Sequence, residues 1–319
     1  MTDTTITVFK KYQVRKTKKQ KRSFAEYVQT VAEKRGYQCK LEKTGFGASN
    51  IVVGDPEKAK VVYTAHYDTC ARLPFPNFIT PKNISIYLLY NILLVLMFFA
   101  VSVMIGILIG VVIGVVSAFF PDPFWAVDLA QAIFLIVYFS LLLLMIFGPA
   151  NKHTANDNTS GVIVLLDLMN EMPDEFKETA AFIFFDMEEA GLFGSMGYAS
   201  KHKAAMKEKL LVNFDCVSDG ENILIVPRKK AAGYAESLSR AYVSNDSVSV
   251  EVATKGVFYP SDQASFPCGV GVAALKRTKK RGILYMDRIH AKKDVIYREE
   301  NIDFLVKGSL KLTEIMSEE

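Results

Sequence analysis

Residues 60–68 read KVVYTAHYD, and residues 180–189 read AAFIFFDMEE. Each stretch begins with an apolar run of strand length and ends in polar side chains. Apolar runs of this kind are typical of strands buried on both faces of a parallel sheet. A third run, LLVNF at residues 210–214, is likewise followed by an acid, Asp215. These stretches predict an α/β sheet whose strands end in polar residues.

Segments of helical and strand character alternate around these runs. The first helix is expected at residues 23–35, because Ser23 can cap it, Glu26 lies at the capping-box position and Gly36 can end it. The alternation predicts a mixed, mostly parallel central sheet with helices on both faces. The remaining expected elements are helices at 160–170, 192–208, 233–243 and 300–317, and strands at 51–53, 222–226 and 270–275.

A long apolar segment, residues 84–150, interrupts this alternation. From Ile84 to Phe120 there are 37 residues without Asp, Glu, Lys, Arg or His, and residues 129–150 are also uncharged. About 20 apolar residues cross a bilayer as a helix. A soluble domain rarely hides two such runs, so we predict a transmembrane helical hairpin joined at Pro121–Pro123. The hairpin is then an insertion into one α/β domain formed by residues 23–83 and 151–319.

Small residues repeat at four-residue spacing in the first apolar run, at Gly106, Gly110 and Gly114. Small residues at this spacing allow close helix approach in a membrane. The partner helix is either the second span or another copy of the chain, which would give a homo-oligomer. Glycines that a membrane helix merely tolerates are the third interpretation.

The N-terminal segment, residues 1–22, is basic. Residues 10–22 hold eight Lys or Arg and no acid. The segment is either a solvated basic face or frayed tail, or a group attracted to an anionic membrane surface. Because positive charge favours the cytoplasmic side, we expect an integral membrane protein whose α/β domain faces the cytoplasm.

Bulk charge and cysteine usage exclude other classes. The net charge of +4 gives no reason to expect a nucleic-acid partner. Four cysteines, none in a CxxC pair, favour reduced thiols over a disulfide framework or a zinc finger. They are Cys39, Cys70, Cys216 and Cys268.

Potential metal ligands follow the predicted strands, at the edge where α/β sheets bind ligands. Two imidazoles and three carboxylates suit two zinc or similar divalent ions, with one carboxylate bridging, better than one catalytic zinc. Taken singly, each residue has an ordinary explanation as a surface side chain, a helix cap or a turn residue. Strand ends supply His66 with Asp68, Glu188 with Glu189, and Asp215, and two further positions, Asp157 and His290, join them, so the two imidazoles and three of these carboxylates complete the set.

Five motifs resemble those of the zinc aminopeptidases of the bacterial leucyl aminopeptidase and aminopeptidase Y type. The resemblance covers residues 60–68 and 151–304, but neither the hairpin nor the first 22 residues. It implies a two-zinc enzyme that removes N-terminal residues from peptides. The motifs are AHYD (65–68), NDNTSG (156–161), EEAGLFGS (188–195), NFD (213–215) and IHAKKD (289–294).

The resemblance also implies a role for each residue. Asp157 would bridge two zinc ions. His66 and Asp215 would complete one site, and Glu189 and His290 the other. Glu188 would be the general base, and Asp68 would hold the ring of His66.

Two positions depart from the family pattern, and three rival functions remain. Relatives often have Ser-Asp-His where this chain has SDQ at 261–263, and Thr where it has Ala291. We expect His153 and His202 to be structural or surface residues. The rivals are a glutaminyl cyclase with a single metal, a carboxypeptidase or dipeptidase, and a non-catalytic receptor-like domain. The cluster KRTKKR (276–281) is a candidate for binding a substrate carboxylate.

Overall fold

The computed structural model describes residues 1–119 and 125–318, and it forms two compact units. Met1–Asn83 and Ala150–Glu319 make up the first, which we call the sheet unit. Ile84–Pro149 make up the second, which we call the hairpin unit. The predicted Pro-rich connection at 121–123 lies outside the described residues.

A mixed, nine-stranded sheet organises the sheet unit, in the order β1-β2-β4-β3-β5-β8-β6-β7, with β9 paired to β8. The four central strands β4, β3, β5 and β8 run parallel to one another. On one side β2 is antiparallel to β4, and on the other β6 is antiparallel to β8. The strands are β1 Cys39–Lys43, β2 Ser49–Val53, β3 Val61–His66, β4 Ala180–Phe185, β5 Leu210–Phe214, β6 Asn222–Pro227, β7 Ser249–Val252, β8 Gly269–Arg277 and β9 Leu284–Tyr285.

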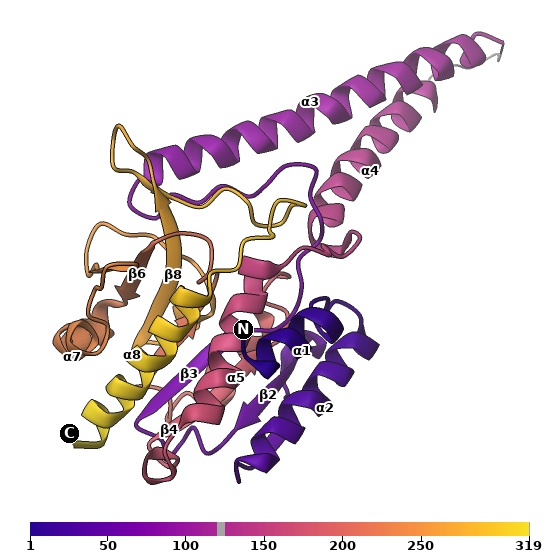
Figure 1. Ribbon diagram of the computed structural model, residues 1–319. Coiled ribbons are helices and arrows are strands. Elements are labelled where there is room, and N and C mark those ends of the chain that lie inside the picture. Colours follow the sequence, from indigo (N-terminus) through magenta and orange to yellow (C-terminus); the bar gives the residue numbers. More distant parts are fainter. Residues whose placement is uncertain (120–124, 319) are drawn as a thin grey trace. The chain divides into compact units, whose positions relative to one another are not determined.

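Successive side chains of the central strands enter two different cores, because side chains alternate across a strand. Tyr63 and Phe182 pack in one core with residues of α5 (Gly161–Glu171) and α8 (Glu299–Glu318). Their neighbours Val62 and Ile183 pack in the other with Tyr198 of α6 (Phe193–Lys201). Helices therefore cover both faces of the sheet, and the predicted fold class is confirmed (Figure 1).

The basic N-terminal segment is folded into the sheet unit as helices, so a solvated basic face describes it better than a frayed tail. It forms α1 (Asp3–Lys11) and begins α2 (Lys18–Lys34). Thr17 caps α2 in a capping box with Gln20, so the predicted cap at Ser23 is wrong, and the helix begins more than a turn earlier. Arg15 is fully buried, and Lys21 forms a 2.5 Å ion pair with Asp186. These two basic residues therefore face protein, whereas most of the others are exposed.

Most predicted elements are present within a few residues of their expected bounds, and the misses lie at the rim of the sheet. The sequence analysis missed α1 and the strands β1, β7 and β9. Helix α6 ends at Lys201, earlier than the predicted residue 208, and α7 covers Ala235–Ala241. Three strands at the rim are short and largely polar or half-exposed, so their sequences give little strand signal.

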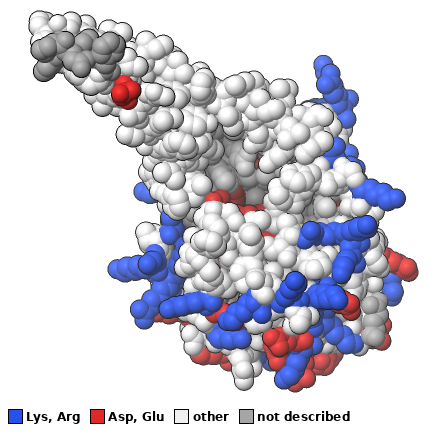
Figure 2. Space-filling model, turned by 180° about the vertical axis from the view of Figure 1, so that it is seen from behind, with Lys and Arg blue, Asp and Glu red and all other residues white. Residues whose placement is uncertain are grey.

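The hairpin unit consists of two long apolar helices. Helix α3 (Ile84–Ser117) and helix α4 (Trp125–Phe147) have mean hydropathies of 3.1 and 2.6 in their most apolar windows, of which 6% and 0% are buried. Both are long and apolar enough to cross a membrane. Their surfaces lack Lys and Arg, in contrast to the sheet unit (Figure 2).

Two of the repeated glycines face the partner helix within this unit. A Cβ atom on Gly106 would lie 3.6 Å from Phe134, and one on Gly110 would lie 3.9 Å from Ala130. A Cβ on Gly114 would meet no atom of the described residues within 4 Å. The close approach of α3 and α4 therefore accounts for two of the three glycines. An oligomer through Gly114 stays a prediction.

Candidate metal centre

Three neighbouring parallel strands deliver acidic and imidazole side chains to one edge of the sheet. His66 is the last residue of β3, which lies between β4 and β5. Glu188 and Glu189 follow β4, and Asp215 follows β5 directly. Because the three strands are parallel, their carboxyl ends meet at this edge.

Asp157 reaches the same edge from the turn that precedes α5. The backbone N–H groups of Asn156 and Asp157 donate to the carboxylate of Asp294, at 2.7 and 3.0 Å. The Asn158 amide donates to the carbonyl of Phe214 and accepts from the N–H of Cys216, at 2.9 and 3.2 Å. Hydrogen bonds to two other segments therefore hold the Asp157 turn in place.

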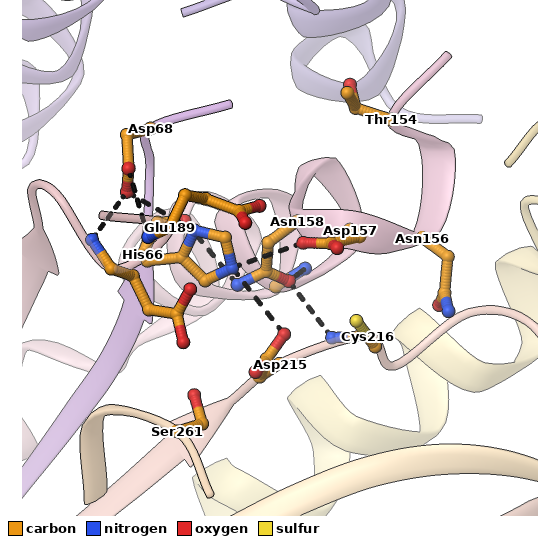
Figure 3. A network of polar contacts seen from close by, with 12 residues as sticks. His66, Asp68, Thr154, Asn156, Asp157, Asn158, Glu189, Asp215, Cys216 and Ser261 are labelled. Carbon is orange, nitrogen blue, oxygen red and sulfur yellow. Dashed lines mark hydrogen bonds and ion pairs between the residues drawn. The ribbon is translucent and has the colours of Figure 1, made fainter. Parts of the chain in front are cut away.

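The carboxylate of Asp157 lies between the two histidines. Its Oδ1 is 3.3 Å from Nε2 of His66, and its Oδ2 is 3.0 Å from Nε2 of His290. Nε2 of His66 is also 3.6 Å from Asp215, and Nε2 of His290 is 3.2 Å from Glu189. The five candidate ligands thus form two groups that share Asp157. Figure 3 shows the first of these groups, His66, Asp157 and Asp215.

Asp68 contacts both His66 and the two glutamates. Its Oδ1 lies 3.4 Å from Nδ1 of His66, on the opposite side of the ring from Asp157 (Figure 3). It also accepts hydrogen bonds from the backbone N–H groups of Glu188 and Glu189, at 3.0 and 3.3 Å. One buried carboxylate therefore orients the imidazole and fixes the loop that carries both glutamates.

The donor atoms are arranged as a divalent cation requires. Donor atoms of His66, Asp157 and Asp215 lie within 4.8 Å of one another. Among the described residues, Asp215 Oδ1 and Glu189 Oε1 are buried without a hydrogen-bond partner. Burial raises the pKa values of Glu188 and Glu189 well above their usual range, and neighbouring carboxylates add to the effect. A bound cation would offset this concentration of negative charge, so the residues fit a metal centre.

Three non-glycine residues at this edge have positive φ angles. They are Met187 before the glutamates, Cys216 after Asp215, and His290 itself, with φ of 56°, 57° and 61°. Such conformations are unfavourable for residues with a Cβ and persist where the surrounding structure imposes them. The backbone is therefore held in uncommon turns at His290, directly before Glu188 and directly after Asp215.

Comparison with protein families gives one match, to the model described as peptidase family M28, over residues 144–304. The match spans half of the chain and includes Asp157, Glu189, Asp215 and His290. The chain belongs to peptidase family M28. The family resemblance inferred from the motifs is confirmed. His66 and Asp68 precede the matched region, and they lie beside it because β3 pairs with β4 and β5.

Solved structures of similar fold include several enzymes. The aminopeptidase LapA of Legionella pneumophila is 16% identical, with a TM-score of 0.57 over 99% of this chain and 68% of that one. A glutaminyl cyclase of Porphyromonas gingivalis is 14% identical, with a TM-score of 0.55 over 98% and 97%. A Zn-dependent exopeptidase of Parabacteroides distasonis is 14% identical, with a TM-score of 0.51 over 98% and 97%. Curated proteins gave no match. Identities this low show the fold alone.

Arg15 contacts two segments that carry residues of this M28 centre, and its role was not predicted from the sequence. Its Nε donates to the carbonyl of Tyr67, between His66 and Asp68, and its Nη1 lies 3.3 Å from Oγ1 of Thr159. It thus connects the segments on either side of the inserted hairpin. Burial lowers the pKa of Arg15 to about 10, a value that leaves it charged at neutral pH. The basic pattern around Arg15 gave no signal that this residue is buried.

The SDQ loop at 261–263 lies beside the centre. Asp262 is fully buried, and within the described part of the chain its carboxylate oxygens have no hydrogen-bond partner. Burial raises its pKa to about 7, and the charges of Asp68 and Asp215 add to this. Gln263 accepts a hydrogen bond from Asn213 of β5 at 3.1 Å, so it supports the sheet at the position where relatives often have His.

Two groups that the sequence analysis weighed lie elsewhere. His202 stacks on Tyr198 and contacts Glu42 and Glu57, as expected of a structural residue. The cluster KRTKKR begins in β8, where Lys276 pairs with Asp287, and continues into an exposed turn before β9. It therefore contributes no side chain to either group of metal ligands.

Proposed function

We propose that the chain is a membrane-anchored aminopeptidase that uses two zinc ions. Membership of peptidase family M28 supports a metallopeptidase, and the residues of the centre support the finer assignment. His66, Asp157 and Asp215 would hold one ion, and Asp157, Glu189 and His290 the other. The fold is shared with an aminopeptidase and with a glutaminyl cyclase, so the fold alone does not choose between these activities.

The observation that carries the proposal is the position of Asp157. Each of its oxygens faces a different histidine, and each histidine has a second carboxylate beside it. A single-metal cyclase needs no carboxylate between two complete groups of donors. This arrangement therefore favours a pair of ions and peptide hydrolysis over cyclisation.

Glu188 is placed to transfer protons in this reaction. Bound at the two positions, the ions would act as Lewis acids and make a water molecule acidic near neutral pH. The Glu188 carboxylate accepts the proton of the attacking water and gives it to the leaving amine. Asp68 holds the backbone of Glu188 and the ring of His66, so the base and one ligand keep a fixed relation.

The test is peptide cleavage by the full-length chain purified in detergent with zinc. We expect release of N-terminal residues from free peptides, no release from N-acetylated peptides, and abolition by a chelator. Glu188→Gln should lower the rate by about 10²–10⁴-fold while metal content is unchanged. Glu208→Gln is the matched control, because Glu208 is exposed. Equal rates for the two variants would contradict the role of Glu188.

A carboxypeptidase or dipeptidase is the second candidate, because a basic residue lies at the centre. Lys16 is half-buried, and burial lowers its pKa, whereas the charge of Glu189 is the largest influence in the opposite direction. A cation in this position suits a substrate carboxylate. Peptides with an amidated C-terminus distinguish the two activities: an aminopeptidase cleaves them, whereas a carboxypeptidase or dipeptidase requires the free carboxylate.

We further propose that α3 and α4 cross a membrane and that the sheet unit faces the cytoplasm. The length and hydropathy of the two helices support the anchoring, and the exposed basic residues near the N-terminus support the orientation. A reporter enzyme fused at residues 121–124 should be active only on the side opposite the cytoplasm. Cytoplasmic activity of that reporter would contradict the orientation.

A further inference from the structure

One buried cysteine lies among the ligands of the second proposed ion. Donor atoms of Cys70, Asp157, Glu189 and His290 all lie within 4.8 Å of one another. Cys70 is fully buried. None of the motifs that identify the family includes this residue, and the sequence analysis treated it as an ordinary thiol.

The position of Cys70 is fixed by the same segments that carry the ligands. Its carbonyl accepts a hydrogen bond from the N–H of Asn151 at 3.0 Å. Three residues later, the N–H of Leu73 donates to the carbonyl of His290 at 2.8 Å. The chain from Cys70 to Leu73 is therefore paired with the segment before Asp157 and with the His290 loop, which holds the thiol beside them.

A second observation at the same place is an oxygen without a partner. Glu189 is 7% exposed in its side chain, and its Oε1 has no hydrogen-bond partner among the described residues. A buried carboxylate oxygen is normally hydrogen-bonded or bound to a cation. The thiol therefore lies beside a carboxylate oxygen that has no hydrogen-bond partner among the described residues and that a cation could bind.

We propose that Cys70 is a sulfur ligand of the ion held by Asp157, Glu189 and His290. The proposal rests on the two-ion centre proposed above. On coordination, the sulfur–hydrogen bond is replaced by a sulfur–metal bond, and the proton passes to solvent. Three other protein ligands and one thiolate fill a tetrahedral zinc site.

This assignment makes the two ions unequal. The group of His66, Asp157 and Asp215 offers three ligands, which leaves a fourth position for water or substrate. The group with Cys70 offers four ligands and is closed, as in structural zinc sites. Sulfur also favours soft ions such as zinc and cadmium over magnesium or manganese. The closed ion thus holds the centre together, and the open one is next to Glu188.

Zinc X-ray absorption of the full-length, zinc-loaded chain tests the proposal without a substitution. We expect a sulfur neighbour at about 2.3 Å, with an amplitude of about one sulfur for every two zinc ions. Two bound ions with only nitrogen and oxygen neighbours would overturn the proposal and leave the aminopeptidase intact. A chain that binds no zinc would overturn both.

Cobalt substitution identifies the sulfur. The cobalt-loaded chain should show the near-ultraviolet charge-transfer absorption of a thiolate ligand, and Cys70→Ser should remove it. Cys216→Ser is the matched control, because Cys216 is buried and adjoins Asp215 but belongs to neither donor group. Cys70→Ser should also weaken the retention of one cadmium ion by at least about tenfold. Loss of the absorption in Cys216→Ser alone would overturn the assignment.

Discussion

The N-terminal segment and the hairpin unit both differ from the usual burial of side chains: the first buries a charged residue, and the second exposes apolar residues. The N-terminal segment is basic, yet Arg15 is completely buried. The hairpin unit is apolar, yet the most apolar windows of its two helices are 6% and 0% buried. Arg15 is stabilised by backbone carbonyls and nearby carboxylates, whereas protein atoms of the described residues leave the apolar helices largely uncovered, as the proposed membrane span would require. Composition alone therefore does not predict whether a side chain is buried in the protein, because burial depends on the groups that surround it.

Deletion of each segment gives the largest expected difference. Removing residues 1–22 should abolish folding of the sheet unit, because it removes α1, the buried Arg15 and the Lys21–Asp186 ion pair. Replacing residues 84–149 with a Gly-Ser linker should give a chain that stays in solution without detergent and still binds metal. Sedimentation, circular dichroism and metal analysis check both. A soluble, folded chain that lacks residues 1–22 would break the comparison.

Substitution of Arg15 or Arg22 in the N-terminal segment gives the next largest expected difference, in the free energy of unfolding. Arg15→Met should lower the free energy of unfolding by about 3 kcal/mol, since it leaves the carbonyls of Tyr12 and Tyr67 without their buried donor. Arg22→Met should change it by less than about 0.5 kcal/mol, because Arg22 is 80% exposed and pairs only with Glu26. Urea unfolding in detergent, followed by circular dichroism, measures both. Similar losses for the two variants would contradict a specific role for Arg15.

Asp167 offers a smaller effect, which depends on pH. It is buried in α5, and Thr2 of the N-terminal segment donates to its carboxylate at 3.2 Å. Burial raises its pKa to about 6. The carboxyl group is protonated in both states at low pH, but between about pH 4 and 6 it ionises more readily in the unfolded chain. Its contribution to stability is therefore complete below about pH 4 and is lost as pH rises through 6.

The substitution that tests this is Asp167→Asn. We expect it to raise the free energy of unfolding by about 1–2 kcal/mol at pH 7.5 and to have little effect at pH 4. Asp174→Asn is the control, because Asp174 is 85% exposed. A uniform effect of Asp167→Asn at both pH values would exclude ionisation as the cause.

The central strands and the residues at their ends could be predicted from the sequence. Runs such as AAFIFF are buried on both faces, so their composition alone indicates a central strand. Three of the sequence positions proposed as ligands or base could be expected to meet because parallel strands end at one edge, and the structure brings their side chains together. His66 could be joined to Asp157 despite the long insertion, because both belong to motifs of known order.

The supporting residues could not be predicted, because their role depends on partners distant in sequence. Nothing local distinguishes Arg15 from Arg22, and only the fold places Arg15 beneath Tyr67 and beside Thr159. Cys70 lies four residues after His66, but the side chains it adjoins in the fold, those of Asp157, Glu189 and His290, all follow the hairpin in the sequence. Asp294 was quoted within a motif, but its hydrogen bonds to the Asp157 turn appear only in the folded chain.

The place of β3 in the sheet has a consequence for biosynthesis. Strand β3 precedes the hairpin, but both of its neighbours, β4 and β5, follow it in the chain. During synthesis, β3 and its last residue, His66, therefore have no strands to pair with until both apolar helices have been made. Apolar helices of membrane-spanning length are inserted into a membrane while the chain is still being synthesised. Under the anchoring proposed above, the hairpin would enter the membrane before β3 pairs with β4 and β5, so the candidate metal centre would form only in chains that are already anchored.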